Sequence, residues 1–157
     1  MKLNIALSDR SRNGVVALLK PLLADAHVLY IKTRKFHWNV TGLHFTELHK
    51  LFEAHYDALA EEIDEIAERI RSLGAMAPGS LAEFSKLARL KESLKDDLDA
   101  NDMVAALLAD HEALIHQLRS DVTTCGKLGD DGTADFLTGL MEAHEKTAWM
   151  LRATLDR

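Results

Sequence analysis

Cysteine, proline and glycine are all scarce in this chain of 157 residues. The one cysteine, Cys125, excludes an internal disulfide framework and a zinc or iron–sulfur site built from several thiolates of one chain. Two prolines and eight glycines are too few for a turn-rich all-β sandwich. No uninterrupted apolar run approaches the roughly 18 residues of a membrane span, and the start has no apolar stretch long enough for a secretory signal. We therefore expect a soluble, cytoplasmic protein with no membrane partner and one domain over residues 1–157.

Charge is unevenly distributed along the chain. The formal net charge is −6, with 28% charged and 47% hydrophobic residues, which is a globular composition. Residues 1–50 carry eight Lys and Arg against three Asp and Glu, whereas the remainder carries eleven against twenty-two, so the balances are +5 and −11. The acidic body argues against strong nucleic-acid binding and suits a surface or cavity that attracts cations.

Apolar residues recur every three or four positions over most of the chain, which predicts helices. The first helix is expected over residues 15–36, either starting late or bending at Pro21, and residues 1–13 are expected to form a flexible N-terminal tail. Turn residues at 39–42 separate it from the longest helix, expected over about 46–73.

The second half of the chain predicts three more helices. Ser80 is a suitable N-cap for a short helix up to residue 90. A long helix follows over about 103–124, capped within 97–101, and a last one begins at Thr133. These elements predict an all-α fold, an up-down four-helix bundle with a short extra helix in the central connection.

The helix over about 46–73 carries two stripes on a helical wheel with His49 at zero. Four potential metal ligands, His49, Glu53, Asp64 and Glu68, fall between about 0° and 100°. A second stripe, between about 200° and 320°, is the face that the bundle core requires. It contains Leu48, Leu51, Phe52, His55, Leu59, Ile63, Ile66, Ile70 and Leu73.

The ligand stripe is too long for one chain to close around one ion. His49 and Glu53 are one turn apart, as are Asp64 and Glu68, but Glu53 and Asp64 lie about 16 Å apart along the axis. Two antiparallel copies of the helix, related by a two-fold axis between positions 58 and 59, bring His49 opposite Glu68 and Glu53 opposite Asp64. The spacing therefore predicts a dimer with two identical metal sites shared across its interface.

A histidine with two or three carboxylates suits Fe(II), Mn or Zn, and open positions on the ion allow redox chemistry with oxygen or peroxide. Acidic stripes are also common on solvent-facing helices. The alternative is that these carboxylates only form ion pairs with Lys50, Arg69 or Arg71.

The same residues carry a resemblance that extends over the whole chain. In the stretch KFHWNVTGLHFTELHKLFEAHYDALAEEIDEIAERI, the chain resembles the Dps family of ferritin-like proteins. The matching motifs are His37-Trp38-Asn39, then His49-x-x-x-Glu53, then Asp64-x-x-x-Glu68-Arg69.

The resemblance implies a ferritin-like homo-oligomer, a hollow dodecamer with ferroxidase activity. It implies that Fe(II) is oxidised to Fe(III), preferably by hydrogen peroxide and otherwise by oxygen, that ferric mineral is stored inside, and that no organic cofactor takes part. Carried over position by position, His37, His49 and Glu53 come from one subunit, and Asp64 and Glu68 come from its partner.

Three further positions are interpreted through the resemblance. Trp38 beside the site would quench a stray radical, and Glu53 stands where many members have Asp, which shifts the geometry of the second iron. Asp135 is a candidate for lining an iron-admitting pore, although acids near a helix start are also favoured by the helix dipole, as Asp130 and Asp131 would be.

Other classes of protein make different predictions. Ferritins proper bind two irons within one bundle through Glu-x-x-His, and this motif is absent from the chain, which disfavours such a site. One alternative is a nucleoid-associated, DNA-compacting protein with a vestigial iron site, and another is a zinc-binding scaffold. Only Lys2, Arg10 and Arg12 precede the first expected helix as DNA contacts, so we expect weak DNA binding or none.

Overall fold

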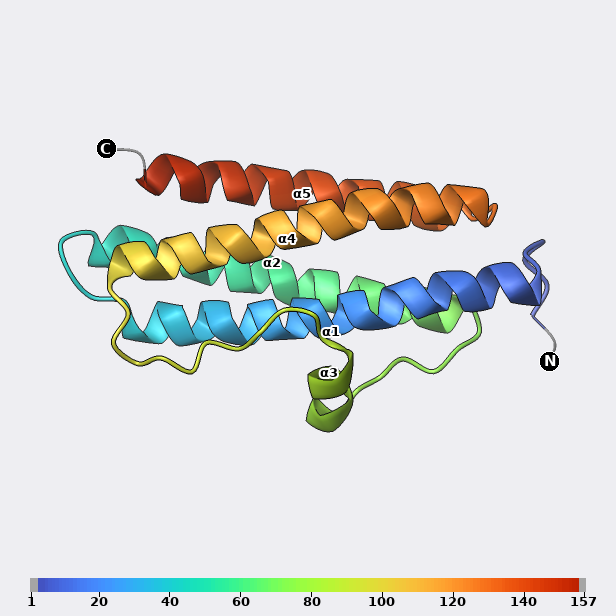
Figure 1. Cartoon of the computed structure of the whole chain (residues 1–157), viewed down its shortest axis with the longest axis horizontal. Helices are drawn as coiled ribbons and strands as arrows, with labels where there is room; N and C mark the ends of the chain where they lie inside the picture. Colours follow the sequence, from blue (N-terminus) through green and yellow to red (C-terminus); the bar gives the residue numbers. More distant parts are fainter. Residues whose placement is uncertain (1–2, 156–157) are drawn as a thin grey trace.

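The computed structural model describes residues 3–155, and within that range every regular element is a helix. The described residues form four long helices and one short one, which confirms the all-α prediction, and Figure 1 shows how they are arranged. Their bounds are α1 Asp9–Asn39, α2 Phe45–Ser72, α3 Leu81–Leu87, α4 Ala100–Lys127 and α5 Asp131–Leu155.

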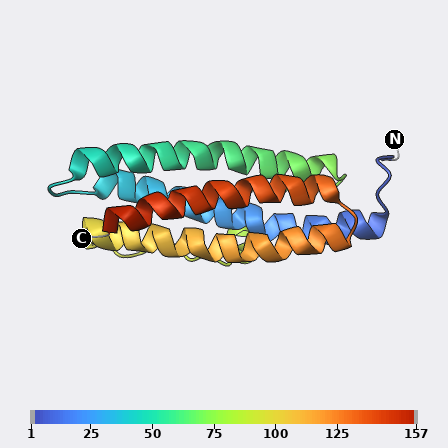
Figure 2. The same cartoon turned by 90° about the horizontal axis from the view of Figure 1, so that it is seen from above.

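The long helices form two antiparallel hairpins, α1 with α2 and α4 with α5 (Figures 1 and 2). The connection from α2 to α4 runs back along the bundle, so α2 and α4 point the same way. The simple up-down order expected from the sequence is therefore wrong in this respect. The long connection, which contains α3, is the physical reason, because it spans the bundle instead of turning at its end.

Helix α1 begins earlier than its apolar periodicity indicates. The Ser8 hydroxyl accepts a hydrogen bond from the amide of Ser11 at 3.0 Å, which caps the helix ahead of any apolar residue. Residues 9–13 are therefore helical, and the expected N-terminal tail of 1–13 is too long. Pro21 lies inside the helix without ending it, since the flanking Leu19 and Leu22 are completely buried and hold both sides in the core.

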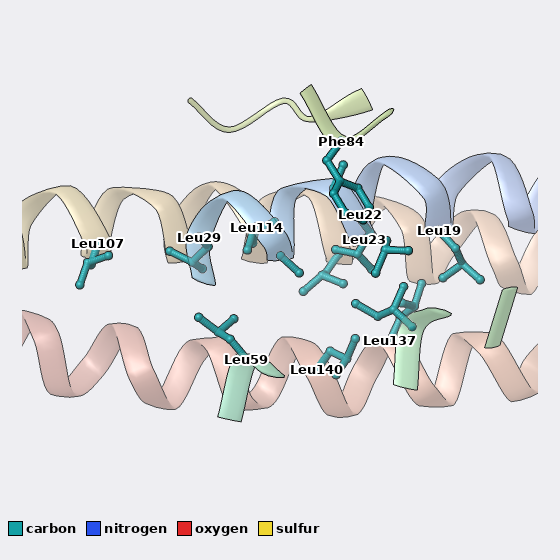
Figure 3. Packing of buried hydrophobic residues seen from close by; sticks show 14 of the residues in the cluster. Leu19, Leu22, Leu23, Leu29, Leu59, Phe84, Leu107, Leu114, Leu137 and Leu140 are labelled. Carbon is teal, nitrogen blue, oxygen red and sulfur yellow. The ribbon is translucent and has the colours of Figure 1, made fainter. Parts of the chain in front are cut away.

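The core consists mainly of leucines from all four long helices. Figure 3 shows Leu19, Leu22, Leu23 and Leu29 of α1 facing side chains of the other helices, with Phe84 of α3 over α1. The Phe84 ring stacks on His27 with 3.8 Å between ring centroids. α3 therefore packs on the outside of α1 and is not a fifth helix of the bundle.

Buried Asp25 of α1 holds the connection that follows α3. Its carboxylate accepts hydrogen bonds from the backbone amides of Arg89 and Leu90 at 2.6 and 2.9 Å, and from Arg89 Nε at 2.7 Å. The amides of Arg89 and Leu90 would donate to backbone carbonyls if the helix continued, but they donate to Asp25 instead. α3 consequently ends at Leu87, before the residue 90 expected from the sequence.

Helix α1 is more apolar over its length than the absence of a long uninterrupted apolar run indicates. It contains an 18-residue window of mean hydropathy 1.5, which is long and apolar enough to cross a membrane by composition alone. More than half of that window, 56%, is buried inside the protein. The apolar surface of α1 is therefore used by the bundle core.

Candidate metal centre

The end of α1 and the beginning of α2 bring His37 and His49 into direct contact. The turn between the helices contains Gly42 at φ +106°, a backbone conformation that favours glycine. The two imidazole rings stack with centroids 3.8 Å apart and planes 19° from parallel. The structure thus places together two histidines that the motif separates by twelve positions.

Each of these rings is held by the backbone of the other residue. His37 Nδ1 donates to the His49 carbonyl at 2.8 Å, and His49 Nδ1 donates to the His37 carbonyl at 2.8 Å. A carbonyl only accepts, so both Nδ1 atoms carry hydrogen and, in the neutral rings, both Nε2 atoms have free lone pairs. This is the arrangement that orients a histidine for a metal ion.

The three carboxylates of the ligand stripe are solvent-exposed and have no ion-pair partner among the described residues. Arg69 pairs instead with Asp130 at 2.8 Å, Arg71 donates to the Ala75 carbonyl at 2.7 Å, and Lys50 forms no ion pair with any described residue. The alternative that these carboxylates only neutralise neighbouring cations is therefore wrong within this chain. They remain available to an external cation.

Aromatic residues adjoin the histidine pair, and sequence reasoning singled out only Trp38, which is 64% exposed. The Tyr56 ring meets His37 edge-on at 5.2 Å, and its hydroxyl donates to Glu53 Oε1 at 3.5 Å. Partial desolvation, followed by the charge of Glu53, raises the pKa of Tyr56, so the hydroxyl keeps its proton. The Arg34 guanidinium lies 4.9 Å from the Trp38 ring centroid and 5.4 Å from that of Tyr56.

No three His, Cys, Asp or Glu side chains within residues 3–155 are already arranged to hold one ion. His37, His49 and Glu53 lie near the α1–α2 turn, whereas Asp64 and Glu68 lie three to four turns further along α2. The sharing of one site between two subunits stays a prediction.

The aspartates near the start of α5 have different environments. Asp130 is 3% exposed, accepts from the amide and hydroxyl of Thr133 at 3.0 and 2.6 Å, and pairs with Arg69. These bonds cap α5 and tie it to α2, so Asp130 is committed to structure. Asp131 and Asp135 are exposed, and the pore assignment of Asp135 stays a prediction.

Comparison with known proteins matches residues 16–157 to the ferritin-like domain. An uncharacterized low temperature-induced protein of Nostoc is 51% identical over 156 residues, covering 99% of this chain and 87% of the relative. The DNA protection during starvation protein 2 of Bacillus anthracis is 36% identical over 143 residues, covering 91% of this chain and 97% of the relative.

Solved structures agree with these matches. A Dps protein from Vibrio cholerae, described as a member of a broad superfamily of ferritin-like diiron-carboxylate proteins, superimposes with a TM-score of 0.93 at 36% identity, covering 99% of this chain and 98% of the other. A Dps protein from Bacillus brevis gives 0.91 at 33% identity, covering 96% of this chain and all of the other.

Proposed function

Because the chain belongs to the Dps family of ferritin-like proteins, we propose that it oxidises Fe(II) at sites shared between two subunits and stores the ferric product. The observation that carries this proposal is the His37–His49 pair, whose Nε2 atoms are free beside carboxylates without ion-pair partners in the described chain. Neutral imidazole and carboxylate together suit iron among the common first-row metals.

In this proposal each site draws on both subunits. His37, His49 and Glu53 of one subunit bind Fe(II) near the α1–α2 turn, and Asp64 and Glu68 of the partner close the site from the other side. The Tyr56 hydroxyl donates to Glu53 Oε1 and so orients this carboxylate. Glu53 has a longer side chain than the Asp that many members have at this position.

Iron is the substrate, and hydrogen peroxide is the proposed preferred oxidant, with oxygen as the other. One peroxide accepts one electron from each of two Fe(II) ions as its O–O bond breaks, giving two hydroxide ions and two Fe(III). Delivering both electrons together avoids the one-electron cleavage that releases hydroxyl radical. The exposed Trp38, with Arg34 against its ring, is placed to donate an electron to a stray oxidant and so quench it.

The proposed assembly is a cytoplasmic dodecamer that encloses ferric mineral and protects the cell and its DNA from oxidative damage. DNA compaction, the second candidate function, receives little support from the basic residues near the N-terminus. Arg12 pairs with Asp9 and donates to the Leu73 carbonyl, Arg10 is exposed, and Lys2 lies outside the described residues. We therefore propose at most weak DNA binding.

The ferroxidase proposal is tested by loading the assembled protein anaerobically with Fe(II), adding hydrogen peroxide and following ferric absorbance. The wild type should outpace a protein-free control and keep the ferric product in solution. Asp64→Asn with Glu68→Gln should slow oxidation at least about tenfold while the assembly stays intact.

Glu47→Gln with Glu65→Gln is the matched control, because it removes two exposed carboxylates of the same helix that lie off the ligand stripe. This control should oxidise iron at the wild-type rate. Normal oxidation by the Asp64 and Glu68 variant would show that the site is assigned to the wrong residues.

A further inference from the structure

Four polar side chains lie inside the bundle, on a different face of α2 from the proposed ferroxidase ligands. His55 and Glu62 come from α2, His111 from α4 and His144 from α5. All four are between 2% and 9% exposed. A buried ionisable cluster of this kind is unusual among the apolar side chains of the core, and requires a physical reason.

The cluster satisfies only part of its own hydrogen-bonding capacity. His144 Nε2 donates to Glu62 Oε1 at 3.1 Å, and the Nδ1 atoms of His144 and His111 face each other at 2.7 Å. Two facing ring nitrogens need one hydrogen between them, so one ring donates to the other. Three buried ring nitrogens have no partner in the described chain: both nitrogens of His55, and Nε2 of His111.

A small cavity adjoins these unpartnered nitrogens. Its volume is about 50 Å³, and all four polar residues line it together with the small side chains of Ala58 and Ala143. This is room for one water molecule or one metal ion, not for an organic ligand.

The spacing of the rings suits a shared ion. An ion about 2.1 Å from a ring nitrogen lies about 3 Å from the ring centroid, so two rings that bind one ion have centroids roughly 5–6 Å apart. The centroids of His111 and His144 are 4.9 Å apart, and those of His55 and His111 are 6.2 Å apart.

We propose that His55, His111 and His144 bind one divalent transition-metal ion of the Zn²⁺ type inside each bundle. Glu62 accepts the remaining N–H of His144 and orients that ring, as carboxylates do behind many metal-bound histidines. The ion takes the place of the proton between His111 and His144 and releases it to solvent. The rings must rotate for this, since they are not yet arranged around an ion.

The site would join the two hairpins of the bundle. His55 belongs to the α1–α2 hairpin, and His111 and His144 belong to the α4–α5 hairpin. One ion bound by all three therefore adds a metal link between two halves of the fold that are otherwise joined by apolar packing and by polar contacts such as Lys32 with Asp110 and Arg69 with Asp130. The proposed role is structural, and it is independent of iron oxidation at the subunit interface.

Cobalt binding tests the proposal in a background that lacks the interface site. Metal-free protein carrying His37→Gln, His49→Gln, Asp64→Asn and Glu68→Gln should bind about one Co²⁺ per chain with a visible absorption band typical of nitrogen ligands. Adding His55→Gln or His111→Gln should weaken that binding at least about tenfold. His116→Gln, at an exposed position of α4, is the control and should leave binding unchanged.

Anomalous diffraction from zinc-soaked wild-type crystals provides a test that needs no buried substitution. The expected result is a zinc peak enclosed by the rings of His55, His111 and His144. Ordinary water density in that cavity, or cobalt binding unaffected by both histidine variants, would overturn the proposal. Since these outcomes do not depend on peroxide or iron, they are distinguishable from a failure of the proposed ferroxidase.

Discussion

The histidines on α2 lie in two different environments, although residue type alone does not distinguish them. His37 and His49 satisfy Nδ1 against each other's backbone, whereas His55 has no partner for either nitrogen within the described chain. Helical periodicity places His49 on the ligand stripe and His55 on the core stripe. That His37 belongs to the same site could be predicted only from the family resemblance. His37 lies on a different helix, and which residues of two helices face each other depends on tertiary packing.

The burial of Glu62 could be predicted from the sequence, but its partners could not. It falls at about 220° on the same wheel, within the core stripe, so periodicity already indicates a buried carboxylate. Its partners on α4 and α5 were not predictable, since nothing in the spacing relates residue 62 to residues 111 and 144. Tyr56 was missed because a tyrosine at that position gives no spacing signal.

Asp130→Ala should destabilise the protein by about 2–3 kcal/mol in urea unfolding. The substitution removes the cap of α5 and leaves the Arg69 guanidinium without its carboxylate. Asp131→Ala, an exposed neighbour, should change the unfolding free energy by less than about 1 kcal/mol. Equal losses for both variants would mean that the two residues act only through the helix dipole.

Stability of the metal-free protein should fall as the pH drops from about 6.5 towards 4. Burial lowers the pKa of His55 to about 4, and burial followed by the charges of His144 and His55 lowers the pKa of His111 well below its usual range. The unfolded chain therefore binds more protons than the folded chain in this interval, which costs up to about 3 kcal/mol for His55 alone. Urea unfolding across this range measures the effect.

Replacing the buried ring provides the comparison for this pH dependence. His55→Gln should have a flatter stability profile between pH 6.5 and 4, while the exposed control His116→Gln should keep the wild-type slope. Glu62, His111 and His144 line the same cavity as His55 and are unchanged in the variant. The difference between the profiles therefore reports the loss of the His55 ring, including its effect on the pKa of His111. Identical slopes for wild type and His55→Gln would contradict the assignment.

Helix existence was predictable for all five elements, but their ends and directions were not. The beginning of α1 depends on a serine cap, and the end of α3 depends on Asp25, a residue more than sixty positions away in the sequence. Periodicity contains neither kind of information. The shared direction of α2 and α4 likewise follows from how the central connection is anchored, which local patterns do not reveal.

Asp25→Ala should destabilise the protein by about 3–5 kcal/mol and loosen the connection between α3 and α4. The buried carboxylate satisfies two backbone amides and the Arg89 guanidinium at once, and all three lose their acceptor. Urea unfolding measures the loss, and hydrogen exchange should become faster over residues 88–99.

Asp96→Ala is the control within the same connection, because Asp96 forms an exposed ion pair with Lys35. Its effect should stay below about 1 kcal/mol. A comparable loss in both variants would show that the buried position of Asp25 does not matter.

At the level of the whole molecule, the chain is a bundle whose proposed iron ligands lie on an outer face. The outer face of α2 carries all four of its proposed ligands, His49, Glu53, Asp64 and Glu68. Because the two pairs lie too far apart to bind the same ion within one chain, the proposed site needs ligands from a second subunit. This arrangement differs from a ferritin site inside one bundle, where all ligands face inward. The family assignment supports the fold, and the sharing of sites is the claim that most needs a direct test.

Complementation between two inactive subunits is that test. One variant carries His37→Gln with His49→Gln, the other Asp64→Asn with Glu68→Gln, and both are co-expressed with different tags so that mixed assemblies can be purified. Each variant alone should oxidise Fe(II) at least about tenfold more slowly than the wild type. Random pairing makes half of the dimers heterodimers, and one of the two sites in each heterodimer regains every ligand, so activity should return to about a quarter of wild type. Verified mixed assemblies that stay inactive would contradict a ferroxidase site shared between subunits.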